Sequence, residues 1–570
     1  MSESNKINVV FVWHMHQPEY RNLQSGEYQL PWTYLHAIRD YVDMAWHLEN
    51  CPKMRAVVNF TPILLEQIED YASQCANWLE LGTETRDPML RALTMAVMPA
   101  NIRERTQLIE ACLRVNESRI IERFAPFHRL AHMARSVIDD HASVEYLSNQ
   151  YLVDLVTWYH LGWLGESVRK TNPHVAHLVE KGGGYSLHDR RLLVELMSEL
   201  MGELIGRYRN LHGRGQIELS CSAYAHPMLP LLISFASAKE AIPDMHLPLL
   251  DQYPGGADRA REQVKRGQEV FNRHFGFDPQ GVWPSEGGIS DAAISLLGEV
   301  GVTWCASGQS VLNNTLGSGG PIDDHQWLYR GYRHEQSGVN IFFRNDELSD
   351  AIGFTYSNWP AKDAVGDLIS RLERIALQPD ASDRIVSIIM DGENAWEYYP
   401  ENAWDFLSKL YEELTTNEHF NITTYSDYLA AHGPGRQLPP IVAGSWVYGT
   451  FSTWIGMQEK CRAWDVLGDV KRTYDAVIAG NELDEVQRAK VDRQLAICEG
   501  SDWFWWLGDY NPREAVSDFE RLFRIHVSNL YVLMKREPPD YLSQRLAHGG
   551  GHAPHGGVMR QGGKPVDSGS

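Results

Sequence analysis

Short apolar runs rich in β-branched residues recur along the chain as far as Met390, and each is typical of a strand buried on both faces. Helical sequence separates these runs, and nearly all of them end in polar, histidine or carboxylate residues. Parallel strands joined by helices form a barrel that binds ligands at the strand ends. The pattern predicts an α/β fold, an incomplete parallel (β/α)7 barrel with one strand fewer than the TIM barrel. The predicted strands are residues 7–13, 54–60, 216–220, 281–283, 302–307, 339–343 and 385–390.

The remaining segments predict additions to this barrel. Residues 87–207 have an irregular helical pattern, which predicts a helical insertion that shapes a cleft or its lid. The Gly/Pro-rich stretch 433–440 predicts a linker that ends the catalytic barrel, residues 1–432. Residues 441–540 are largely helical and rich in tryptophan, and we expect them to complete the cleft. The Gly/His-rich residues 541–570 predict a disordered tail, with weak metal binding by its histidines as the alternative: His548, His552 and His555.

The charge and cysteine content exclude several classes of function. The chain has 74 acidic and 52 basic side chains, a formal net charge of −22, which disfavours nucleic acid and anionic lipid as partners. Its seven cysteines include no CxxC pair, so neither a disulfide framework nor a zinc cluster is indicated. No signal peptide is recognisable, and no apolar stretch approaches the ~20 residues that span a bilayer. We expect a cytoplasmic protein that acts on a neutral ligand, and no pattern indicates its oligomeric state.

Carboxylates follow the strand 385–390 directly. Asp391 and Glu393 are two residues apart, so they share one face of an extended chain, and their repulsion raises one of the two pKa values. Trp396 and two tyrosines come next. A carboxyl group beside apolar walls can hold its proton near neutral pH and act as a general acid, and flat aromatic faces suit sugar rings. The alternative is a buried acidic turn that caps the next helix.

Histidines follow the first predicted strand, and a carboxylate lies within the third. His14 and His16 are two residues apart, but no third ligand lies nearby in the sequence. Contacts to sugar hydroxyls, or a structural role in the core, are therefore favoured over a metal site. Glu218 lies in an apolar strand, where an unpaired charge would be costly, so we expect either a ligand contact or a structural salt bridge.

Charged residues also follow two of the later strands. Trp283 comes shortly before Glu286 and is expected to form an apolar wall beside it. The two glycines after Glu286 let the backbone turn sharply or approach a ligand closely. A solvated glutamate in a helix-capping turn is the alternative. Arg344 and Asp346 crowd the end of the strand 339–343 in the same way.

Four motifs, in this order along the chain, resemble those of glycoside hydrolase family 57. They are HMHQP from His14, QIEL with Glu218, WPSE ending at Glu286 and DGEN from Asp391, and DWFWW from Asp502 also belongs to the resemblance. The resemblance runs from residue 7 to about residue 510. The WPSEGG and DGENAWEYY forms are most similar to the α-amylase and amylopullulanase branch.

The resemblance implies a retaining mechanism on α-glucans, with α-1,4 and also α-1,6 links as targets. It implies Glu286 as the nucleophile, Asp391 as the general acid/base, and no cofactor. Retaining glycosidases hold these two carboxyl groups about 5 Å apart, and two residues so distant in sequence meet only if the barrel closes. The predicted substrate-binding residues are His14, His16, Gln17, Glu218, Trp283, Arg344, Asp346, Glu393, Trp396, Asp502 and Trp503.

Three alternative functions remain open at this point. The first is a 4-α-glucanotransferase or a branching-type transglycosylase, which the sequence separates poorly from a hydrolase. The second is a metal-dependent carbohydrate deacetylase, suggested by His14 and His16 on a related type of barrel. The third is a catalytically silent glucan-binding protein.

Overall fold

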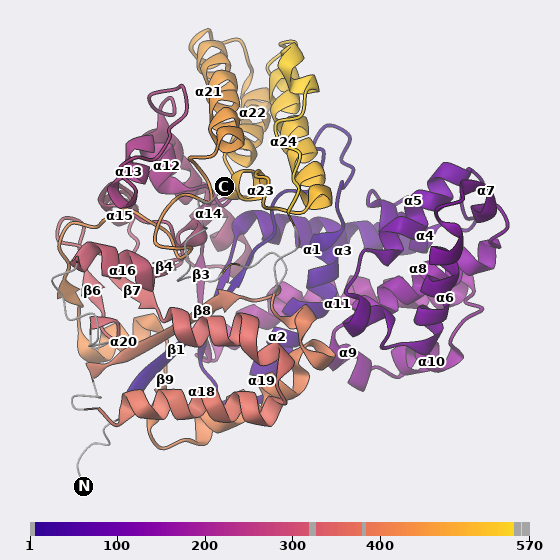
Figure 1. Cartoon of the computed structure of the whole chain (residues 1–570), viewed down its shortest axis with the longest axis horizontal. Helices are drawn as coiled ribbons and strands as arrows, with labels where there is room; N and C mark the ends of the chain where they lie inside the picture. The colour runs from indigo at the N-terminus through magenta and orange to yellow at the C-terminus, as the bar shows by residue number, and fades with distance from the viewer. Residues whose placement is uncertain (1–5, 318–326, 379–382, 552–559, 561–570) are drawn as a thin grey trace.

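Seven parallel strands close into a barrel in the computed structural model, which describes residues 6–317, 327–378, 383–551 and 560 (Figure 1). Each strand pairs with the next, and the pairs β7–β8 and β8–β1 close the ring. The incomplete (β/α)7 barrel predicted from the sequence is confirmed. Its strands are β1 (Ile7–Met15), β2 (Ala56–Phe60), β3 (Ile217–Cys221), β4 (Gly281–Val282), β5 (Trp304–Gly308), β7 (Asn340–Arg344) and β8 (Ile385–Asp391).

Alternation along the strands decides which side chains reach the barrel interior. Val10 and Val12 of β1 pack with Ile389 of β8 in one cluster, whereas Phe11 and Trp13 belong to the larger core beneath the helices. Because successive side chains of a strand point to opposite faces, the next interior positions are His14 on β1 and Asp391 on β8. These two residues are partners in the β1–β8 register. The strand pattern thus delivers them together to the carboxyl-terminal mouth of the barrel.

Three short strands extend the sheet outside the ring. β9 (Phe420–Ile422) pairs in parallel with the first residues of β1, next to the segment of β1 that pairs with β2. β6 (Tyr332–Arg333) runs antiparallel to β7, and β10 (Arg436–Gln437) pairs with β6. The stretch 433–440, predicted as a linker, therefore includes a strand of this sheet. These pairings are two or three residues long, which is too short to leave an apolar pattern in the sequence.

Helices cover the outside of the ring. They include α1 (Trp32–His36), α2 (Val42–Asn50), α12 (Leu229–Ile233), α13 (Ala238–Ala241), α14 (Gly256–Phe275), α15 (Asp291–Glu299), α16 (Gln309–Leu316), α17 (Asp346–Asp350), α18 (Ala361–Ala376) and α19 (Trp404–Thr416). α20 (Tyr425–His432) instead packs Tyr425 and Tyr428 against the interior cluster of Val10, Val12 and Ile389. Among the described residues, no helix is long and apolar enough to cross a membrane.

A helical lobe lies between β2 and β3, at the right of Figure 1. The chain leaves β2 through α3 (Pro62–Leu81), passes through seven shorter helices and returns along α11 (Leu187–Gly213). This is the region where the sequence predicts an insertion at 87–207, and α11 runs on to Gly213. The shorter helices are α4 (Pro88–Thr94), α5 (Ile102–Leu113), α6 (Ala125–Val137), α7 (His141–Val144), α8 (Asn149–Trp163), α9 (Glu166–Thr171) and α10 (Pro173–Lys181).

The C-terminal helices are tied to the barrel next to the strand ends. The helices are α21 (Gln458–Ala479), α22 (Glu485–Cys498), α23 (Ser501–Trp506) and α24 (Arg513–Leu533). Glu499, between α22 and α23, is fully buried and accepts hydrogen bonds from Arg259 Nε at 2.8 Å and from the Tyr253 hydroxyl at 2.8 Å. The Ser501 amide donates to the carbonyl oxygen of His226, just beyond β3. These contacts hold the start of α23 against the mouth of the barrel.

Packing against the C-terminal helices continues beyond residue 540, where the sequence predicts a disordered tail. Leu542, Leu546 and Ala547 are buried, and the Leu546 amide donates to Glu520 Oε1 of α24 at 2.7 Å. The glycines and histidines around them mask these few apolar side chains in the sequence pattern. Residues 552–559 and 561–570, which complete the predicted tail, lie outside the described residues.

Candidate active site

A cavity of about 380 Å³ lies at the carboxyl ends of the strands. Its walls come from segments far apart in the sequence: the ends of β1, β7 and β8, the loops after β3 and β4, the insertion, and the C-terminal helices. The lining residues include His14, His16, Gln17, Trp32, Arg114, Trp163, His226, Glu286, Arg344, Asp391, Glu393, Asn394, Trp446, Asp502, Trp505, Trp506, Phe519 and Arg560. The two predicted catalytic carboxylates and six of the predicted substrate-binding residues thus share one cavity.

Glu286 has a strained backbone that presents its carboxyl group to the cavity. It lies just after the two-residue strand β4, with φ of 57° and ψ of 25°, the left-handed conformation that costs a non-glycine residue about 1 kcal/mol or more. The following Gly287 also has positive φ, and a Cβ there would lie 3.0 Å from the Trp283 ring. Trp446 holds the segment, because its amide donates to the Glu286 carbonyl and its Nε1 donates to Glu286 Oε2 at 3.0 Å.

Burial raises the pKa of the Glu286 carboxyl well above its usual value, and the neighbouring charges of Asp502 and Asp391 raise it further. Hydrogen bonds from Trp446 and Ser501 oppose this shift because they stabilise the carboxylate form. Burial also raises the pKa of Asp391, against a hydrogen bond from Asn394 Nδ2 at 3.1 Å. Carboxyl groups that repel one another in a buried site share protons, so this pair can supply one acid and one base.

Glu393 lies beside Asp391 but is held by different partners. Gln17 Nε2 donates to its Oε1 at 3.2 Å, and its Oε2 is buried without a hydrogen-bond partner. Burial raises its pKa well above the usual value, and the charge of Asp391 adds to the effect. The repulsion expected between these two carboxylates is therefore present, and it acts on Glu393, which lies two residues beyond the end of β8.

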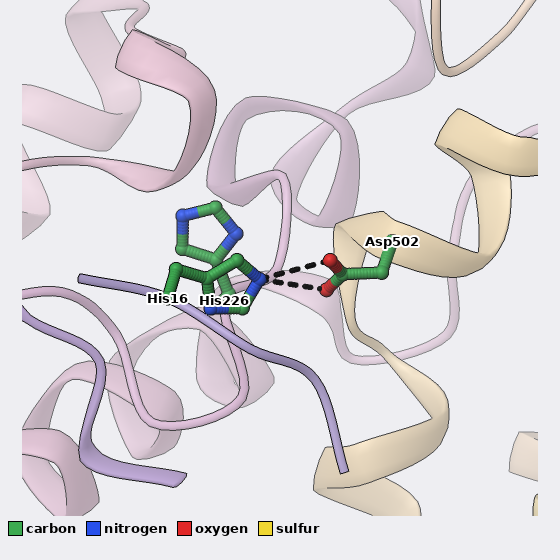
Figure 2. Close-up of side chains that lie close together, drawn as sticks. All are labelled: His16, His226 and Asp502. Atoms are coloured by element: carbon green, nitrogen blue, oxygen red, sulfur yellow. Dashed lines mark hydrogen bonds and ion pairs between the residues drawn. The ribbon is translucent and has the colours of Figure 1, made fainter. Parts of the chain in front are cut away.

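Three histidine rings pack together beside these carboxylates. The ring centroids of His16 and His226 are 3.8 Å apart, and those of His14 and His226 are 5.0 Å apart. His16 Nε2 faces both carboxylate oxygens of Asp502, at 2.9 and 3.0 Å (Figure 2). Burial and the neighbouring His16 lower the pKa of His14 to about 3, and the same causes lower that of His226 well below its usual value.

Five of the predicted substrate-binding residues lie outside the cavity lining: Glu218, Trp283, Asp346, Trp396 and Trp503. Glu218 accepts hydrogen bonds from Trp304 Nε1 and from Ser426, so neutral donors satisfy it in place of the expected ligand or salt bridge. The Trp396 and Trp503 indoles donate to the carbonyl oxygens of Gly392 and Ile497 within the core. These two tryptophans are buried and do not line the cavity.

Arg344 reaches the cavity, while its partner Asp346 lies behind it. Arg344 donates to Asp346 Oδ1 at 2.8 Å and to Asp350 Oδ1 at 2.7 Å, and its guanidinium lies 5.5 Å from the Trp446 ring centroid. Burial raises the pKa of Asp346 to about 6 despite the charge of Arg344. This pair fixes the wall next to Trp446.

Sequence reasoning missed His226 and Trp446 as lining residues, and within the tryptophan-rich stretch that it assigned to the cleft it named Trp503 in place of Trp505 and Trp506. On α23, Trp505 and Trp506 lie three and four positions after Asp502, so one helix face carries all three. Trp503 lies on the other side of α23 and is buried. The helical spacing contained this signal. The sequence contains no such signal for His226 and Trp446, because tertiary contacts determine the positions of their loops.

Comparison with known proteins gives a family match over most of the chain. The model described as glycosyl hydrolase family 57 matches residues 10–441. A 1,4-α-glucan branching enzyme of Thermococcus kodakarensis is 30% identical over 108 residues, which cover 19% of this chain and 13% of the relative. A 4-α-glucanotransferase of Thermococcus litoralis is 23% identical over 266 residues, which cover 44% of this chain and 33% of the relative. The matched stretches therefore span at most a third of either relative.

Solved structures share the fold over nearly the whole chain. A branching enzyme from Thermococcus kodakaraensis superposes with a TM-score of 0.58 at 17% identity, covering 92% of this chain and 90% of that one. The α-amylase AmyC from Thermotoga maritima superposes with a TM-score of 0.57 at 13% identity, covering 94% of this chain and 96% of that one. Since the family model covers well over half of the sequence, the chain belongs to glycosyl hydrolase family 57.

Proposed function

We propose that this chain is a retaining glycosidase of the α-amylase and amylopullulanase type, which hydrolyses α-1,4 links of α-glucans and also α-1,6 links. One observation carries the proposal: Glu286 and Asp391 share one cavity, close enough for the charge of Asp391 to raise the pKa of Glu286. A pair of carboxyl groups across a sugar site is the machinery of glycoside cleavage. We place the protein in the cytoplasm, where it would act as a soluble enzyme.

In the first step, the Glu286 carboxylate attacks the anomeric carbon while Asp391 gives its proton to the leaving glycosidic oxygen. The bond from the anomeric carbon to that oxygen breaks, and an ester bond to Glu286 forms. The attack requires the ionised form of Glu286, and two hydrogen bonds, from Trp446 and Ser501, favour that form against the burial that raises its pKa. Asp391 accepts one side-chain hydrogen bond, from Asn394, and its raised pKa suits it to carry the proton.

In the second step, Asp391 acts as a base. It takes a proton from water, the resulting hydroxide oxygen bonds to the anomeric carbon, and Glu286 leaves as a carboxylate. The proton lost by Asp391 in the first step is thereby restored. Two displacements at one carbon retain the α configuration.

Aromatic side chains surround this pair and suit a sugar chain. Trp446, Trp505, Trp506 and Phe519 line the cavity, and Trp32 and Trp163 line the wall formed by α1 and the insertion. Flat apolar faces pack against the CH-rich faces of glucose rings, while the carboxylates and histidines offer hydrogen bonds to the hydroxyl groups. A neutral glucan also agrees with the net charge of −22, which would repel an anionic polymer.

The expected products test the hydrolase proposal directly. With amylose or pullulan as substrate, reducing ends should rise steadily with time, because water takes the second step. With maltotriose, we expect glucose and maltose. A ladder of longer oligomers, with almost no net gain in reducing ends, would overturn hydrolysis.

A 4-α-glucanotransferase or a branching-type transglycosylase is the second candidate. Trp505, Trp506 and Phe519 lie together on the C-terminal wall of the cavity, where they could hold an acceptor sugar and exclude water. The names of the two curated relatives, a branching enzyme and a 4-α-glucanotransferase, favour the same alternative. The WPSEGG form favours the hydrolytic branch, so hydrolysis remains our proposal. The maltotriose experiment separates the two.

Replacing Trp446 by phenylalanine is expected to lower kcat/KM by about 10- to 100-fold, since a hydrogen bond to a charged group contributes about 1.5–3 kcal/mol. The ring remains, but Glu286 loses the donor at 3.0 Å. Without that donor the pKa of Glu286 rises further, so the acidic limb of the kcat/KM profile should move to higher pH. Trp359→Phe, at a side chain that is 41% exposed and outside the cavity lining, is the matched control. An unchanged acidic limb in Trp446→Phe would contradict this role.

A further inference from the structure

The side chains of His14, His16, His226 and Asp502 form a cluster in the cavity that makes or breaks no bond in the two displacement steps. In each of the three rings, Nδ1 has a side-chain oxygen as its hydrogen-bond partner: Asn59 Oδ1 at 2.7 Å, Thr61 Oγ1 at 3.0 Å and Ser501 Oγ at 3.0 Å, respectively. A second hydrogen bond of this kind fixes the tautomer and orientation of metal-binding histidines in proteins. The direction of each hydrogen bond at Nδ1 therefore decides whether Nε2 of a neutral ring carries a proton or a lone pair.

The partners of His14 set its tautomer. Asn59 Nδ2 donates to Ser220 Oγ at 3.0 Å, which leaves Oδ1, the acceptor of this amide, facing His14 Nδ1 at 2.7 Å. His14 Nδ1 must then carry the proton, and Nε2 keeps its lone pair. Nε2 is buried and has no hydrogen-bond partner.

The same reasoning applies to His16. The Thr61 hydroxyl donates to the Met15 carbonyl oxygen at 3.4 Å, so its oxygen accepts the proton on His16 Nδ1. In a neutral ring, Nε2 would then turn a lone pair toward the two oxygens of the Asp502 carboxylate, at 2.9 and 3.0 Å. Two acceptors at that distance repel each other, so a positive charge must lie between them. That charge is a proton on His16 or a bound cation.

His226 adds a third donor atom. The Ser501 hydroxyl contributes a hydrogen bond that stabilises the Glu286 carboxylate, so its oxygen accepts from His226 Nδ1. His226 Nε2 is left buried without a partner, and the side chain is 1% exposed. His226 itself has a φ of 56°, a strained conformation that the surrounding structure must hold in place.

We propose that His16, His226 and Asp502 form a binding site for a divalent transition metal ion of the Zn²⁺ class. One ligand atom of each residue lies within 4.8 Å of the others, and Figure 2 shows the His16 and His226 rings together to the left of the Asp502 carboxylate. Zinc takes imidazole nitrogen at about 2.0–2.1 Å and carboxylate oxygen at about 2.0–2.2 Å, so its ligand atoms lie roughly 3.3 Å apart. The His16 and Asp502 atoms already approach this spacing, and a three-ligand site requires the His226 ligand atom, which lies within 4.8 Å of both, to move closer.

The residue types favour Zn²⁺ over Ca²⁺ or Mg²⁺. Two imidazoles and one carboxylate match borderline transition metals, whereas the alkaline-earth ions prefer sites built from oxygen. All three residues line the cavity, so the remaining coordination position is open to water or to a sugar hydroxyl.

Titration of the apo protein with ZnCl2 in a calorimeter tests the site without any need for turnover. The tail histidines would add a background, so the titration uses the full chain carrying His548→Ala, His552→Ala and His555→Ala. We expect saturable binding of one ion per chain. Co²⁺ should bind in the same stoichiometry and give the intense visible absorption of a four- or five-coordinate ion. Failure of the glycosidase assignment would not affect either readout.

Variants locate the ion. Thr61→Val removes only the acceptor of His16 Nδ1–H and should lower the affinity for Zn²⁺ about 10- to 100-fold. His226→Ala and the isosteric Asp502→Asn each remove a ligand and should lower the affinity at least as much. His128→Ala, at an exposed histidine of α6, is the matched control and should leave binding unchanged. Thermal melts of each variant establish that it is folded, and Asp502→Asn keeps the shape of the side chain if His226→Ala does not fold. Absence of saturable binding, or unchanged binding in Asp502→Asn, would overturn the proposal and leave His16 and Asp502 as an ion pair.

Discussion

Glu286→Gln is expected to lower kcat on α-glucans by more than about 1,000-fold, a loss of at least about 4 kcal/mol of transition-state stabilisation. The amide has the shape of the carboxylate and can still accept from Trp446 Nε1, but it cannot form the glycosyl ester. Glucan binding should remain nearly unchanged, because the aromatic walls are intact. Measured kcat with maltooligosaccharides, and a dissociation constant from calorimetry, separate the two effects. A variant that kept roughly a tenth of the wild-type kcat, a cost of only about 1.4 kcal/mol, would exclude Glu286 as the nucleophile.

The same substitution should leave the protein at least as stable as the wild type at neutral pH. The raised pKa of Glu286 means that its ionised form costs folding free energy, since the carboxylate is buried near Asp502 and Asp391. This cost is absent below the unfolded-state pKa and is fully present above the folded-state pKa. Glutamine removes the charge, so the thermal midpoint should be equal or higher. Glu299→Gln, at the exposed end of α15, is the control, and a lower midpoint for Glu286→Gln alone would contradict this account.

Sequence patterns were sufficient for the barrel because most of its strands are short, nearly continuous apolar runs that end in polar residues. Val10, Val12 and His14 are spaced two residues apart on β1, as are Ile389 and Asp391 on β8. Side chains with this spacing point to the same face of a strand. This spacing, together with their positions at the strand ends, indicates from the sequence that His14 and Asp391 face the carboxyl-terminal mouth of the barrel. The position of Glu286 follows less directly, because β4 has only two residues and the left-handed turn at Glu286 has no signature other than the two glycines behind it.

The hydrogen-bond partners of the predicted site residues could not be predicted, because they depend on contacts between residues far apart in the sequence. Asp502 meets His16 across 486 residues, and Trp446 meets Glu286 across 160. No local period links such pairs. The metal interpretation of His14 and His16 was set aside for lack of a nearby third ligand, yet the fold brings both His226 and Asp502 to His16. Conversely, Trp283, Trp396 and Trp503 belong to the motifs but are buried in the core.

Asp391→Asn is expected to separate the two steps of the reaction. General acid catalysis contributes about 100- to 10,000-fold, so turnover of natural glucans should fall by this factor. An α-glycoside with a good aryl leaving group needs little protonation, and its first step should be nearly as fast as in the wild type. The glycosyl ester on Glu286 should then accumulate, because no base activates water. A burst of aryl alcohol followed by slow turnover is the expected time course.

Added azide should restore turnover of the aryl substrate in Asp391→Asn, since a charged nucleophile needs no base. It must attack the face of the sugar that Asp391 serves, opposite Glu286, so the product should be the α-azide with retained configuration. Asp363→Asn, at an exposed position of α18, should show neither the burst nor the rescue. Equal losses on glucan and aryl substrates would remove Asp391 from the acid role. A β-azide would mean that azide attacked from the side assigned to Glu286, and both carboxylate assignments would then have to be exchanged or abandoned.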